Sequence, residues 1–178
     1  KLETFSKTMI QQIDTLTQIA NSFSDFANID NRSEERFPIK DELKRIVDLF
    51  KNNNVKFYTK LPKPETIQVH IDKTHLTRIV NNLVKNSLQA ENPNVPIEVT
   101  VELGTENNNC TILVRDNGVG IANEIKNKIF EPNFTTKNSG MGLGLSMVKK
   151  IVTDFNGRIN YVTSKKGTTF NVIIPMVK

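Results

Sequence analysis

The chain has 178 residues, 37% of them hydrophobic and 24% charged, a balance typical of one folded domain with an appendage. No apolar run reaches the roughly 18 residues that a membrane span needs, and no signal peptide is recognisable. The net charge of +5 is spread along the chain, which argues against a nucleic-acid partner, and the single cysteine, Cys110, excludes an internal disulfide or a cysteine zinc cluster.

The first 29 residues are predicted to form one long helix. Apolar side chains follow a heptad spacing with Gln12 as the polar exception, and they are Leu2, Phe5, Met9, Leu16, Ile19, Phe23 and Phe26. Ile13, Ala20 and Ala27 widen this stripe, which suits a four-helix bundle better than a two-stranded coil. The helix could instead pack on its own domain. A seam this long, with no second helix in the chain to cover it, favours self-association.

A polar segment at 30–37 is predicted to link this helix to a single domain over 38–178. Helical patterns in the domain occupy 41–51, 73–90, 123–129 and 143–155, and strand patterns occupy 55–61, 66–71, 97–103, 111–115, 158–163 and 168–174. Asp72 is placed to cap the second of these helices, and Gly157 is placed to end the last. This order predicts an α+β fold, a two-layer α/β sandwich with helices on one face of a mixed, mostly antiparallel sheet.

The first candidate binding motif is Asn82-Asn-Leu-Val-Lys-Asn86, inside the helix predicted at 73–90. Asn82 and Asn86 are four residues apart, so they share one helix face, opposite the apolar stripe that should pack on the sheet. An asparagine oxygen can complete a magnesium shell that phosphate oxygens and water otherwise fill. Taken alone, the spacing is more typical of a solvated helix face, so its interpretation depends on the motifs that follow.

The second motif is Asp116-Asn-Gly118-Val-Gly120, directly after the strand predicted at 111–115. A carboxylate at a strand end can accept a hydrogen bond from the exocyclic amine of adenine, whereas guanine presents an acceptor at that position. Glycines at 118 and 120 would let the backbone approach the flat base closely. Taken alone, an ordinary Asp-Asn-Gly turn explains these residues equally well.

The third motif, Gly140-Met-Gly142-Leu-Gly144-Leu145, opens the helix predicted at 143–155. Backbone amides freed by glycine, together with the positive end of the helix dipole, make an anion site. The motif is not a dinucleotide fingerprint, because no βαβ unit surrounds it, and it lacks the Gly-Lys-Ser/Thr ending of a P-loop.

In this order, the three motifs resemble the ATP-binding domain of sensor histidine kinases, within the gyrase, heat-shock chaperone, histidine kinase and MutL superfamily. Residues 129–137 (Ile-Phe-Glu-Pro-Asn-Phe-Thr-Thr-Lys) resemble that family's phenylalanine box, 140–152 its second glycine box, and 167–170 its last motif. The resemblance covers roughly residues 35 to 178 and implies the Bergerat ATP-binding fold, with ATP and Mg²⁺ as cofactors and Asn86 as the magnesium ligand. The nucleotide contacts that it implies are Asn82, Lys85, Asn86, Asp116, Gly118, Gly120, Phe130, Thr136, Lys137, Gly140, Gly142, Leu143, Gly144, Leu145 and Thr168.

A histidine kinase phosphorylates a histidine on the first helix of its dimerisation bundle, and no residue of this chain resembles that site. The two histidines, His70 and His75, lack the acidic residue and the proline that typically follow a phosphoacceptor. The helix predicted at 1–29 resembles the second bundle helix. We therefore expect a fragment of a longer protein, which binds ATP but does not phosphorylate itself because the phosphoacceptor lies before Lys1.

Two alternatives stay open within the superfamily. ATP-hydrolysing members usually carry a glutamate base four residues before the magnesium asparagine, but this chain has Asn82, and an amide cannot act as a general base at neutral pH. A degenerate domain that uses ATP only as a conformational switch is the second alternative, and the intact motifs argue against it.

The preferred hypothesis is transfer of the γ-phosphate to a histidine, for relay to the receiver domain of a response regulator. We expect homodimerisation through the helix bundle of the parent protein and no nucleic-acid partner. We also expect a cytoplasmic location for this part, with any membrane anchor upstream.

Overall fold

The computed structural model describes residues 33–51, 54–59, 67–93, 95–137 and 141–177, and, near the N-terminus, 5–6, 8–10, 12–13, 16–17, 20 and 23–24. These N-terminal residues are helical, as predicted for 1–29. The described seam residues Phe5, Met9, Leu16 and Phe23 expose half or more of their surface, while Leu2, Ile19 and Phe26 lie outside the described residues. In the described part of the chain, no helix is long and apolar enough to cross a membrane.

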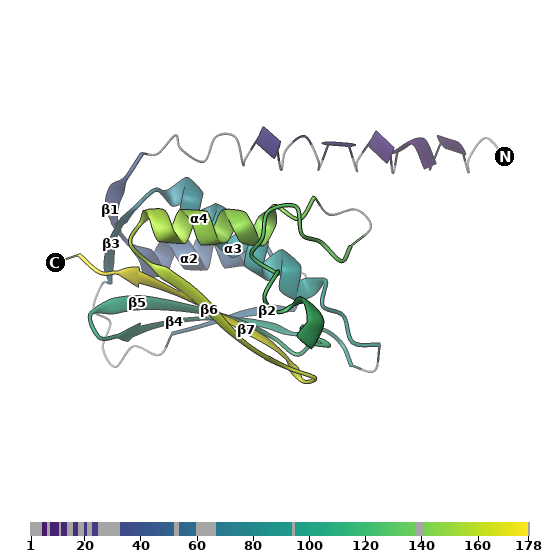
Figure 1. Cartoon of the computed structure of the whole chain (residues 1–178). Coiled ribbons are helices and arrows are strands. Elements are labelled where there is room, and N and C mark those ends of the chain that lie inside the picture. Colours follow the sequence, from purple (N-terminus) through teal and green to yellow (C-terminus); the bar gives the residue numbers. More distant parts are fainter. Residues whose placement is uncertain are drawn as a thin grey trace.

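The domain is built on a five-stranded sheet with the strand order β2-β4-β5-β7-β6. Its strands are β2 (Val55–Thr59), β4 (Val99–Glu106), β5 (Asn109–Asp116), β6 (Arg158–Ser164) and β7 (Gly167–Pro175). Only β2 and β4 pair in parallel, which confirms the mixed, mostly antiparallel sheet. The helices α2 (Ile39–Asp48), α3 (Lys73–Leu88) and α4 (Gly144–Asp154) cover one face of it and complete the two layers (Figure 1).

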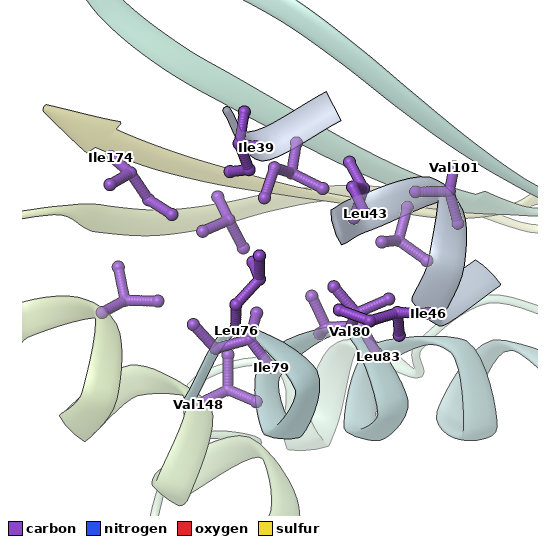
Figure 2. Close-up of a cluster of buried hydrophobic side chains, with 14 of the residues drawn as sticks. Ile39, Leu43, Ile46, Leu76, Ile79, Val80, Leu83, Val101, Val148 and Ile174 are labelled. Atoms are coloured by element: carbon purple, nitrogen blue, oxygen red, sulfur yellow. The ribbon is translucent and has the colours of Figure 1, made fainter. Parts of the chain in front are cut away.

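The hydrophobic core lies between these helices and the sheet. Figure 2 shows Ile39, Leu43 and Ile46 of α2, Leu76, Ile79, Val80 and Leu83 of α3, Val148 of α4 and the sheet residues Val101 and Ile174 pointing into this layer. All are essentially inaccessible to solvent, so truncating one of the larger ones to Ala would cost about 2–5 kcal/mol of stability. The core fixes the orientation of α3, and it thereby directs the opposite face of that helix away from the sheet.

The strand predicted at 66–71 does not join the main sheet. Its described part includes β3 (Gln68–Ile71), which pairs antiparallel with β1 (Glu35–Pro38) in a separate two-stranded sheet. β1 comes from the segment expected to be a linker. Its Phe37 is buried in the core together with Val69 of β3, so the end of this segment is part of the domain.

Asp72 caps α3, as predicted, and also holds the segment before β1. Its Oδ1 accepts hydrogen bonds from the backbone N–H groups of Thr74 (2.6 Å) and His75 (3.2 Å), and its Oδ2 accepts one from the N–H of Ser33 (2.7 Å). Burial favours the protonated acid, but these bonds and the nearby His75 outweigh burial, and the pKa of Asp72 is lowered. One carboxylate therefore joins the predicted linker to the helix that carries the asparagine motif.

Two local predictions need adjustment. The helix expected at 123–129 is only a 3₁₀ turn, η2 (Asn123–Ile125), followed by further turns. Asn156, with φ of 56°, takes the left-handed position after α4, and the N–H of Gly157 then donates to the Val152 carbonyl (2.9 Å).

Candidate nucleotide-binding site

A cavity of about 870 Å³ lies between α3, the adjoining ends of β5 and β7, the start of α4 and the loop residues 134–137. Most of the predicted site residues line it: Asn82, Lys85, Asn86, Asp116, Gly120, Thr136, Lys137, Gly142, Leu143, Gly144, Leu145 and Thr168. The segments that supply them come from several separate parts of the sequence, but α3 and α4 lie side by side over the sheet (Figure 1).

Two of the predicted residues that the structure describes, Gly118 and Phe130, are not part of the cavity lining. Gly118 faces the backbone of Ala90, whose carbonyl oxygen lies 2.0 Å from where a Cβ would stand. Phe130 packs edge-on against Tyr161, with ring centroids 6.0 Å apart. Gly140 lies outside the described residues.

Asp116 is a buried carboxylate at the end of β5. The sheet register pairs Arg115 with Thr169, so Asp116 lies beside the first residues of β7. Its Oδ1 accepts hydrogen bonds from the N–H groups of Gly118 and Thr168, both at 3.0 Å. Burial raises the pKa of Asp116, while these bonds and the Ser87 hydroxyl oppose the shift. Because both backbone bonds go to Oδ1, Oδ2 keeps acceptor capacity for a donor in the cavity.

Two hydroxyl groups extend this end of the site. The Oγ1 atoms of Thr163 and Thr168 lie 3.0 Å apart, and the N–H of Ile121 donates to Thr163 Oγ1 (2.9 Å). Sequence reasoning singled out Thr168 but missed Thr163, because the link from 163 to 121 depends on the hairpin of β6 and β7 folding back over the loop after Asp116. No local signal in the sequence points to it.

The start of α4 is packed closely on α3. A Cβ on Gly144 would stand 2.6 Å from Asn82 Oδ1, so glycine lets the Asn82 side chain stay where it is. The Asn82 amide in turn donates from Nδ2 to the Arg78 carbonyl (2.8 Å). Gly142 has φ of +67° and faces the backbone of residues 133–134, which also requires glycine. The glycines of this motif thus fix where the first turn of α4 lies.

The first turn of α4 keeps its backbone donors available. Leu143, at the N-cap position, makes no side-chain hydrogen bond to the turn. The Ser146 hydroxyl points back and donates to the Leu143 carbonyl (3.0 Å). Uncapped N–H groups and the helix dipole together favour an anion at this end of the cavity.

Lys137 holds the amide that was predicted to bind magnesium. Its Nζ donates to Asn86 Oδ1 (3.1 Å) and to Gln89 Oε1, and burial lowers the pKa of the lysine. Gln89 was missed in the sequence, although it lies nearly one helical turn after Asn86. An amide oxygen that accepts from an ammonium group is oriented to interact with a cation.

The polar groups of the cavity suit a ligand that carries both a base and phosphates. Among the described residues, no group of three or more His, Cys, Asp or Glu side chains could hold a metal ion. The asparagine oxygen can therefore serve as one magnesium ligand only if the phosphates supply others.

The chain is similar to proteins of one ATPase family. The model of the histidine kinase-, DNA gyrase B- and HSP90-like ATPase family matches residues 71–178. Sensor protein TdiS of Thauera aromatica is 27% identical over 94% of this chain and 32% of its own length, and sporulation kinase B of Bacillus subtilis is 29% identical over 96% of this chain and 40% of its own. The chain thus spans well under half of either relative.

Solved structures share the fold. The catalytic domain of the histidine kinase ThkA superposes with a TM-score of 0.70 at 29% identity, over 80% of this chain and 95% of that domain. Full-length ShkA in complex with AMPPNP reaches a TM-score of 0.81 over 99% of this chain and 39% of its own, at 20% identity, and supports the fold alone. This chain therefore belongs to the histidine kinase-, DNA gyrase B- and HSP90-like ATPase family, and its domain is the ATP-binding catalytic domain of a sensor histidine kinase.

Proposed function

We propose that the domain binds ATP with Mg²⁺ in this cavity and transfers the γ-phosphate to a histidine outside the chain. The observation that carries the proposal is that one cavity joins three features: the buried carboxylate of Asp116, the Asn86 amide held by Lys137, and the uncapped start of α4. These features match the chemical needs of an adenine ring, a magnesium ion and a phosphate chain.

Asp116 is proposed to recognise adenine. Its Oδ1 is engaged by two backbone amides, which hold the carboxylate in place and leave Oδ2 to accept from the exocyclic amine. The same carboxylate would face the acceptor oxygen of guanine, so it selects against that base.

Asn86 is proposed as the one magnesium ligand that the protein supplies, with Asn82 and Lys85 on the same helix near the phosphates. Magnesium, when bound, neutralises charge on the phosphates during transfer. The N–H groups at Gly142, Leu143, Gly144 and Leu145 are proposed to bind phosphate oxygens. Lys137 and Thr136 lie on the loop beside them and would contact the phosphates from the other side.

Transfer is favoured over hydrolysis because nothing at position 82 can activate water. Asn82 donates from its amide to its own helix and faces Gly144 with its oxygen, and an amide is not a base at neutral pH. Neither histidine suits the acceptor role. His75 is 1% exposed in the core beside Phe155, and His70 lies on β3 without the acidic residue and proline that typically follow an acceptor.

A response-regulator receiver domain is the proposed partner, with homodimerisation through the N-terminal helix in the parent protein. ThkA, a structural neighbour, has been solved in complex with the response regulator TrrA. The exposed apolar residues Phe5, Met9, Leu16 and Phe23 support a helix that packs against others.

The proposal is tested by calorimetric titration of this chain with a non-hydrolysable ATP analogue and with the matching GTP analogue, with and without Mg²⁺. Binding of the ATP analogue, strengthened by Mg²⁺ and much tighter than that of the GTP analogue, is the expected result. Equal affinity for the two bases in the folded protein would contradict the assignment of Asp116.

A further inference from the structure

Lys137 binds two amide side chains of α3 at once. Its Nζ donates to Asn86 Oδ1 (3.1 Å) and to Gln89 Oε1, and all three residues line the cavity. Gln89 is the C-cap residue of α3 and lies three positions after Asn86, so the two side chains are neighbours on the helix surface. Together the two oxygens hold one positive charge, which a distant loop of the chain supplies.

The ammonium group of Lys137 and a magnesium ion need the same oxygen. Asn86 is the amide that is proposed above to bind Mg²⁺, and its Oδ1 is the atom that accepts from Lys137. Two cations on one amide oxygen would lie only a few ångströms apart, and they repel one another strongly at that distance. Mg²⁺ therefore binds Asn86 only when the ammonium group leaves it.

A phosphate chain offers the displaced ammonium group a stronger partner. A hydrogen bond from lysine to an ionised phosphate oxygen is stronger than one to a neutral amide. When metal and phosphates arrive together, the metal can take Asn86 while Lys137 takes a phosphate. Gln89 opposes this exchange, because its Oε1 competes with the phosphates for the same ammonium group.

We propose that Gln89 is a positioning residue that holds the Lys137 ammonium on Asn86, and that Mg²⁺ with the nucleotide binds by displacing this ammonium. The inference rests on the proposed roles of Asn86 and Lys137 in binding magnesium and phosphate. It adds a residue that weakens the binding of the metal–nucleotide complex. It also makes the two ligands interdependent, since the metal alone offers the displaced ammonium group no new partner.

The test removes the Gln89 amide and measures affinity for the non-hydrolysable ATP analogue with Mg²⁺ by calorimetry. Gln89 is exposed at the end of α3, so Gln89→Ala removes no core contact. The Kd should fall about 2- to 5-fold, the lower part of the range for one hydrogen bond, because this bond is open to water. Gln68→Ala, on β3 and outside the cavity lining, is the matched control and should leave the Kd unchanged.

Two further measurements show whether Gln89 acts through Lys137. In a Lys137→Met background, Gln89→Ala should leave the Kd unchanged, because the ammonium group on which Gln89 acts is gone. Without nucleotide, mass spectrometry can follow the acetylation of Lys137 by acetic anhydride. Acetylation should be faster in Gln89→Ala than in wild type, since the amine has lost one of its two partners, and it should keep its wild-type rate in Gln68→Ala.

Three results would overturn the inference. The first is an unchanged or weaker affinity in a Gln89→Ala variant that thermal unfolding shows to be folded. The second is the same gain of affinity in the Lys137→Met background, because Gln89 would then act by another route. The third is an acetylation rate of Lys137 that Gln89→Ala does not change. Failure of the wild type to bind the analogue, or to bind it more tightly with Mg²⁺, would instead refute the proposed function itself.

Discussion

Replacing Asp116 by Asn isolates the role of the carboxylate in recognising the base. The side-chain oxygen of Asn can still accept from the N–H groups of Gly118 and Thr168, so the fold should be retained. The new Nδ2 group is a donor and would face the adenine amine, which is also a donor. Asp116→Ala is less informative, because two buried N–H groups would lose their acceptor at roughly 1–3 kcal/mol each.

The magnitude follows from the loss of one charge-assisted hydrogen bond, about 1.5–3 kcal/mol. The Kd for the ATP analogue should therefore rise roughly 10- to 150-fold in Asp116→Asn, since each factor of ten corresponds to about 1.4 kcal/mol. Calorimetry measures the affinity, and thermal unfolding checks that the variant is folded. A Kd within about twofold of wild type in a folded variant would refute the adenine contact.

The same residue predicts a pH dependence. Burial raises the pKa of Asp116, so the carboxylate takes up a proton at a higher pH than an exposed aspartate does. Binding that needs the ionised form is lost as the pH falls through this raised pKa. Asp116→Asn should lack that loss of affinity. If the affinity for the ATP analogue falls in the same way at low pH in both proteins, the prediction is contradicted.

Three further predictions concern other residues. Asp72→Ala should destabilise the domain by about 1–2 kcal/mol through loss of the α3 cap and the Ser33 contact. The pKa of Asp72 is lowered in the folded protein, so this stabilisation is present above the unfolded-state pKa and is lost as pH falls through the folded-state pKa. Urea unfolding curves of variant and wild type should therefore converge in acid and differ at neutral pH. Asn86→Ala should remove the effect of Mg²⁺ on affinity for the ATP analogue while leaving metal-free affinity nearly unchanged, and a Mg²⁺ effect of wild-type size would exclude Asn86 as a ligand. Burial raises the pKa of Cys110 to about 12, so a thiol reagent should label it only after unfolding, and rapid labelling of the native protein would contradict its buried position.

Much of the site could be predicted because its residues obey local rules. Asn82 and Asn86 share one face of a helix whose opposite face is continuously apolar, and that periodicity is visible in the sequence. Asp116 ends the mostly buried strand β5, so its position at a strand end was also predictable.

The contacts that were missed join residues far apart in the chain. Lys137 reaches Asn86 across 51 positions, and Thr163 reaches Ile121 across 42, so no local pattern encodes either contact. Ser87 continues the buried stripe of α3, so the sequence alone indicates a small core residue. The structure shows that it also lines the cavity, as Asp116 does.

The two-stranded sheet was missed for a different reason. Only four residues of β1 pair, and two of them are charged, so the alternation is too short to distinguish a strand from a linker. What makes it a strand is its pairing with β3 and the capture of the Ser33 N–H by Asp72, both of which are tertiary contacts.

The most direct test of phosphotransfer uses a longer protein that includes the segment upstream of Lys1. It is incubated with γ-labelled ATP and Mg²⁺, and both protein-bound label and free phosphate are measured. The account predicts label on the protein that is labile in acid and stable in base, as phosphohistidine is, and none on this chain alone. Release of free phosphate without labelled protein would contradict it, and would mean that Asn82 does not prevent hydrolysis.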